Sequence, residues 1–222
     1  MKIEGELKDG LDLALNEAYL LAFEYDDVLN KVAVIFETVM VDTDDNRVIF
    51  HFSGVSRCSA RLLMGMWDDE NANVLKMTPD ELSAQLDSYN GDSMYGWEFI
   101  NIEDSKEKFE EWKDKLSFDV IISQESESTN CIDIFSEQFI GSPKTLDLRI
   151  CFEEIQIETL SGRPMSIHEF IDRGTEGWNA IYSGNEEVTD KYGIIPADTL
   201  TKQKITPVHS TIWTRLRNWF TK

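Results

Sequence analysis

Apolar positions recur along the chain with the spacing of short strands and short helices. Residues 31–41 and 47–56 are rich in β-branched and aromatic side chains, and the polar residues 42–46 separate them. This pattern predicts an antiparallel pair of strands. Residues 145–159 alternate between apolar and polar positions, which predicts a strand in a sheet with one face in solvent. Further strands are expected at 96–102, 116–123, 131–139 and 177–184.

Three segments carry the signals of short helices. Thr78 and Glu81 can form a capping box at the start of a helix over 78–89. A second helix is expected over 105–115. A third begins after Ser166 and ends at Gly174. Residues 11–23 fit a helix or a strand, and 184–209 are expected to form a loop.

The last residues of the chain predict an amphipathic helix. With Ser210 as the N-cap, five apolar residues fall on one face, namely Ile212, Trp213, Leu216, Trp219 and Phe220. Residues 199–222 contain five Lys or Arg residues and no acid. We expect this helix to pack against the acidic body of its own chain; a partner protein, a second copy and a membrane surface are the alternatives.

These elements predict an α+β fold: antiparallel sheet or sheets, several short helices and the C-terminal amphipathic helix. We expect one compact domain over 1–222, with a weak boundary that would separate 1–115 from 116–222. Shifting the sequence by 100 residues aligns the apolar positions Val48 and Phe50 with Leu148 and Ile150. The chain is therefore a candidate for an internal duplication, although residue identity between the two stretches is near chance.

Charge changes this picture most. The chain has 222 residues with 42 acidic and 21 basic side chains, a formal charge of −21. Such a charge opposes binding to bare nucleic acid and favours encounter with a basic partner. The start of the chain lacks the apolar region of a signal peptide, and no apolar run is long enough to span a membrane. With three cysteines and no paired spacing, a cytoplasmic location is expected.

Catalytic and metal-binding patterns are missing from the sequence. The three histidines lie far apart, and none has a second ligand at metal-site spacing. Asp42, Asp44 and Asn46 match the start of a calcium loop, but Arg47 stands where that loop needs glycine. We therefore expect neither a metal nor a cofactor. An enzyme remains an alternative, with a site assembled from His51, His168 and nearby carboxylates.

Two acidic loops are the candidate binding residues. One contains Asp42, Asp44 and Asp45, and the other contains Trp67, Asp68, Asp69 and Glu70. The three acids beside Trp67 make that tryptophan hard to bury, and tryptophan is a favoured interface anchor. We expect both loops to contact a partner protein.

The sequence is therefore interpreted as an acidic, non-catalytic, cytosolic protein that binds another protein, which is expected to be basic. In general profile it resembles the bacterial immunity proteins that neutralise toxin nucleases, although it carries no motif of one immunity family. The resemblance implies a one-to-one complex in which carboxylates cover a toxin's basic substrate cleft. A structural subunit of a homo-oligomer is a further alternative, and the oligomeric state is open.

Overall fold

The computed structural model describes residues 1–41, 45–89, 91, 98–100, 102–122, 128–139 and 141–192. Asp42 and Asp44 lie outside these ranges. So does the predicted C-terminal helix, with Ile212, Trp213, Leu216, Trp219 and Phe220.

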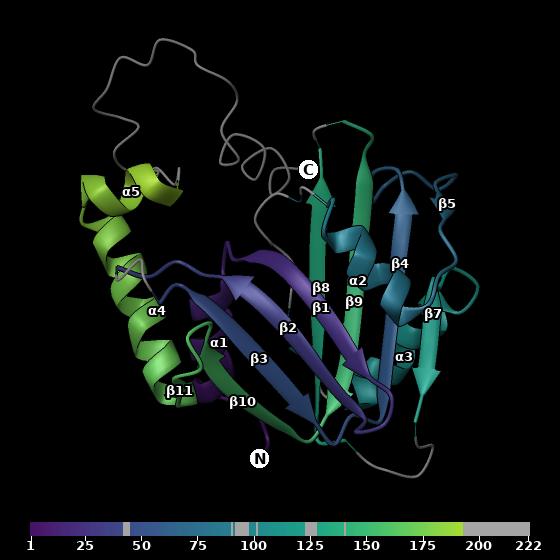
Figure 1. Cartoon of the computed structure of the whole chain (residues 1–222), viewed down its shortest axis with the longest axis horizontal. Coiled ribbons are helices and arrows are strands. Elements are labelled where there is room, and N and C mark those ends of the chain that lie inside the picture. The colour runs from purple at the N-terminus through teal and green to yellow at the C-terminus, as the bar shows by residue number, and fades with distance from the viewer. Residues whose placement is uncertain are drawn as a thin grey trace.

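Over the described residues the fold is α+β, with two antiparallel sheets and five helices (Figure 1). In chain order the elements are α1 Glu6–Leu15, β1 Tyr19–Asp26, β2 Lys31–Glu37, β3 Arg47–Ser53, β4 Arg57–Met64, β5 Asn73–Val74, α2 Pro79–Leu86, β6 Glu98–Ile100, α3 Ile102–Trp112, β7 Phe118–Ile121, β8 Asn130–Gln138, β9 Lys144–Phe152, β10 Glu154–Thr159, β11 Pro164–Met165, α4 Ile167–Tyr182 and α5 Glu186–Tyr192. Within the described ranges, no helix has the length and apolarity that crossing a membrane requires.

Two short connections join the sheets. The first sheet has the order β1-β2-β3-β10-β11 and the second β5-β4-β9-β8-β6, with β7 also paired to β4. The chain passes from β3 to β4 at Gly54 and from β9 to β10 at Glu153. Gly54 has a φ of 61°, and a Cβ there would lie 2.8 Å from the Glu153 side chain. Glycine therefore permits the close contact between the two connections in which the chain changes sheets.

The strand order has an internal symmetry that matches the 100-residue offset. The hairpin β2–β3 continues into β4 of the second sheet, and the hairpin β8–β9 continues into β10 of the first. β3 consequently lies between β2 and β10, as β9 lies between β8 and β4. Strand pairing crosses residue 116, because 1–115 supply β4, β5 and β6 to the second sheet and 116–222 supply β10 and β11 to the first. Duplication of the sequence stays a prediction.

One apolar core lies between the inner faces of the sheets and extends to α1, α2 and α4. Phe50 packs edge-on against Phe36 and Phe170, which joins the first sheet to α4. The predicted capping box of Thr78 and Glu81 is confirmed. A second capping box is expected from Ser166 and Glu169, and of it the N-cap bond is present, in which the Ser166 hydroxyl accepts from the Glu169 amide.

Three predictions for the segment after residue 166 are wrong. α4 does not end at Gly174 but runs to Tyr182, so 177–184 is not a strand. Gly174 permits close packing, because a Cβ there would lie 2.6 Å from the Cβ of Ala14 on α1. α5 also forms where a loop is expected.

Candidate functional site

The outer face of the second sheet carries a polar grid. We use this name for Arg57, Ser59, Arg61, Asp119, Asp133, Asp147 and Arg149. Strand register places Asp133, Arg149, Ser59 and Asp119 in one row across four strands. Asp147 lies opposite Arg61 in the next row. These side chains alternate with the core residues of the same strands.

Each arginine of the grid has an aspartate partner. Arg149 Nη2 donates to Asp133 Oδ2 at 2.7 Å, and Arg61 Nη2 lies 2.6 Å from Asp147 Oδ2. The fork of Arg57 donates through Nε and Nη2 to the two oxygens of Asp119, both at 2.8 Å. These pairs neutralise the face without leaving a free cation in the grid.

Helix α3 covers Arg57 and Arg149 of the grid with two aromatic rings. The Arg57 guanidinium lies 3.6 Å from the Phe109 ring centre, and that of Arg149 lies 3.7 Å from the Trp112 ring centre. Arg149 is 1% exposed. The prediction that one face of the strand at 145–159 is wet is therefore wrong over β9, since a helix and its rings replace solvent there.

Burial changes the acidity of the grid in two directions. Burial opposes ionisation of Asp119, but hydrogen bonds from Arg57 and Ser59 outweigh it and lower the pKa of Asp119. Burial raises the pKa of Asp147 to about 6, against the attraction of Arg61. Asp133 adds to the rise and Arg149 opposes it.

Replacing Asp147 with asparagine is expected to change how stability depends on pH. An aspartate whose pKa is higher in the native than in the unfolded protein stabilises the native state fully below its unfolded pKa of about 3.9. This stabilisation is lost as the pH rises through the native pKa. Between about pH 5 and about pH 7, wild type should lose about 1 kcal/mol relative to Asp147→Asn. Urea unfolding of both proteins across this range measures the difference. A difference that stays constant would mean that Arg61 keeps Asp147 ionised throughout.

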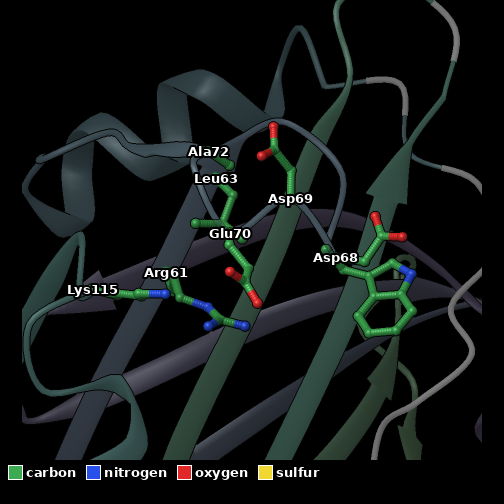
Figure 2. A pocket seen from close by; sticks show the side chains of 8 residues that line it. Arg61, Leu63, Asp68, Asp69, Glu70, Ala72 and Lys115 are labelled. Atoms are coloured by element: carbon green, nitrogen blue, oxygen red, sulfur yellow. The ribbon is translucent and has the colours of Figure 1, made fainter.

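Beyond α3 the same face opens into a pocket of about 310 Å³. Arg61 and Leu63 of β4 line it, together with Lys115 after α3 and the β4–β5 loop residues Trp67, Asp68, Asp69, Glu70 and Ala72. In Figure 2 Glu70 points toward the Arg61 guanidinium, whereas Asp69 points away from it. Arg61 thus belongs both to the grid and to the pocket wall.

Two residues of the sheet hold the backbone of the pocket loop. The buried Glu137 carboxylate accepts from the Trp67 amide at 3.3 Å, and the Thr145 hydroxyl donates to the Gly65 carbonyl at 3.0 Å. Within the loop, the Asn71 amide donates to the Asp69 side chain. Trp67 is therefore presented on an anchored backbone.

The rim of the pocket is acidic. Asp68, Asp69 and Glu70 are exposed, and no ion pair within the described residues involves them. Arg61 is already neutralised by Asp147, which leaves the exposed Lys115 as the other cationic group of the lining. The pocket therefore has a net negative charge and suits a cationic group.

Of the first predicted acidic loop only Asp45 is described, and it lies beside α4 rather than with the Trp67 loop. Figure 1 shows the β2–β3 connection beside α4, and the β4–β5 connection on the opposite side of the view. Asp45 pairs with Arg163 at 2.9 Å and with Arg173 at 3.4 Å. The hydrogen bond from Arg163 is the largest cause of the lowered pKa of Asp45. Its charge is engaged within the chain.

The two histidines of the alternative enzyme site are not paired. His51 Nε2 lies 3.0 Å from Glu158 Oε1, and both side chains are partly exposed on the outer face of the first sheet. His168 is exposed in the first turn of α4. In the described ranges, no group of three or more His, Cys, Asp or Glu residues could hold a metal ion.

Sequence reasoning finds the pocket rim but misses the grid and the strand β4. The signal for β4 is present, since Arg57, Ser59 and Arg61 alternate with apolar residues over 57–62. No spacing in the sequence relates them to Asp119 or Asp133, which come from other strands.

Comparison with known proteins finds no relative of this chain. No protein-family model matches the chain, and no curated protein or solved structure matches it either.

Proposed function

We propose that this chain is a non-catalytic, cytosolic protein that binds a basic protein at the Trp67 pocket, in the manner of an inhibitor or immunity protein. The observation that carries the proposal is the exposure of Trp67. Its side chain is 50% exposed between carboxylates, whereas Trp112 and Trp178 are 6% and 2% exposed. An exposed tryptophan ringed by charges is an effective interface anchor.

The anchored loop supports the same function. Glu137 and Thr145 fix the loop backbone, so a partner would not have to order it on binding. The rim carboxylates would attract and then pair with lysine or arginine side chains of the partner. An overall charge of −21 would accelerate that encounter.

Reversing the charge of the pocket rim is expected to weaken binding of the partner protein. The variant Asp68→Lys, Asp69→Lys, Glu70→Lys should bind it at least about tenfold more weakly, because rim charges that attract become repulsive. The matched control is Glu186→Lys, Glu187→Lys, Asp190→Lys. It makes the same change in net charge at three exposed residues of α5. Tagged full-length proteins would be used to capture partners from a lysate of the source organism at low and moderate salt.

A stoichiometric basic protein retained by wild type and the α5 control, and lost by the rim variant, would support the proposal. Equal capture by both variants would refute the site. Capture of no stoichiometric protein by wild type at either salt concentration would refute the binding function. Trp67→Ala, which leaves every charge in place, tests the anchor separately by the affinity of the captured partner.

A further inference from the structure

A pair of cysteines lies under α3, apart from the proposed binding pocket. Cys131 of β8 and Cys151 of β9 are directly opposite in the strand register. Their sulfur atoms are 2.9 Å apart, and no disulfide joins them. Directly opposed residues of antiparallel strands have Cα atoms about 4.5–5.5 Å apart, within the range that disulfides bridge. The two sulfurs can therefore bond without rearrangement of the sheet.

Phe109 of α3 covers this pair. Its ring and the two cysteines form a small apolar cluster of their own, in which Cys131 is 0% and Cys151 1% exposed. The Arg57 guanidinium stacks on the same ring. Burial raises the pKa of the Cys131 thiol well above its ordinary value. With α3 in place the pair is protected from oxidants, because a buried thiol is a poor nucleophile.

We propose that Cys131 and Cys151 are a redox modification site, which forms a reversible disulfide with small-molecule disulfides when α3 lifts Phe109 from the sheet. One thiolate attacks the small disulfide, forming a mixed disulfide and releasing one small thiolate. The second cysteine thiolate then attacks the protein sulfur of that intermediate, which closes the Cys131–Cys151 bond and releases the second small thiolate. The two protein thiols are oxidised, the small disulfide is reduced, and the two protons pass to the released thiolates.

Cys58 provides a control within the same chain. It lies one residue from Arg57 on β4, but its side chain faces the main core and is 0% exposed. Movement of α3 does not uncover it, whereas global unfolding exposes all three cysteines. Selective reaction of the Cys131–Cys151 pair therefore distinguishes local opening from unfolding.

The full-length protein would be incubated with glutathione disulfide, then acid-quenched, alkylated and mapped by mass spectrometry. We expect a Cys131–Cys151 cross-linked peptide while Cys58 stays a thiol. Phe109→Ala should accelerate cross-linking about tenfold or more, because it removes the cover. Phe109→Leu, which keeps an apolar cover, should react at nearly the wild-type rate.

Three results would overturn the proposal. The first is the absence of the cross-linked peptide in both wild type and Phe109→Ala. The second is modification of Cys58 in step with the pair, because oxidation would then follow unfolding. The third is a lasting glutathione adduct on one cysteine, because the partner sulfur would then be out of reach.

Discussion

Replacing Arg149 with alanine is expected to destabilise the protein by about 3–5 kcal/mol, because it leaves a buried charge without its partner. The Arg149 side chain is 2% exposed and that of Asp133 is 15% exposed, and they form an ion pair at 2.7 Å. Removing the guanidinium also takes away the surface on which Trp112 stacks at 3.7 Å. The loss should detach α3 from the sheet and unfold the protein at lower urea concentration.

A second variant separates charge from packing. Arg149→Met combined with Asp133→Asn removes both charges and keeps most of the volume under α3, so it should recover at least half of the stability lost by Arg149→Ala. Urea unfolding followed by circular dichroism measures all three proteins. If the double variant is as unstable as Arg149→Ala, the cost arises from the stacking on Trp112 and not from the ion pair. A cost below about 1 kcal/mol for Arg149→Ala would show that the grid does not hold α3.

Replacing Gly177 with alanine is expected to cost about 2–3 kcal/mol, because the new atom would collide with backbone. A Cβ at Gly177 would lie 2.5 Å from the carbonyl oxygen of Val39 and 2.9 Å from its carbonyl carbon. Neither atom can rotate away as a side chain can. Relief of the clash would have to move α4 from the β2–β3 connection, where Trp178 packs on Val39.

Gly10→Ala is the matched control for this substitution. Gly10 is also within a helix, but a Cβ there would meet the side-chain carbons of Ile171, the nearest at 2.8 Å. These carbons can shift, and alanine is about 1 kcal/mol better than glycine in a helix interior. We therefore expect Gly10→Ala to change the free energy of unfolding by less than about 1 kcal/mol. Similar costs for the two variants would show that the contact with the Val39 backbone is not decisive.

Local signals predict the elements that depend on local chemistry. Thr78 and Glu81 identify the start of α2 because a capping box needs only residues three apart. The pairing of β2 with β3 follows from two apolar runs joined by a polar turn. Trp67 is exposed as expected, because three adjacent carboxylates oppose its burial.

The same signals mislead where distant segments decide the outcome. Gly174 resembles a helix stop and Gly177 begins a predicted strand, yet both lie inside α4, where they allow contact with Ala14 and with the backbone of Val39. The alternation at Asp147 and Arg149 is typical of a strand with one face in solvent. Arg149 instead lies under the Trp112 ring of α3, and Asp147 pairs with Arg61. Nothing near these residues in the sequence indicates which segment covers them.

The sequence by itself determined the α+β class, the antiparallel hairpins, the capped helix starts and the acidic, exposed loop at Trp67. Each of these depends on the spacing and charge of residues close together in the chain. Only the tertiary structure decided that the chain changes sheets after β3 and after β9, that α3 covers the polar grid and that the pocket opens beside Arg61. These features depend on pairing between strands far apart in sequence, where the free energy comes from burial that no single segment achieves alone.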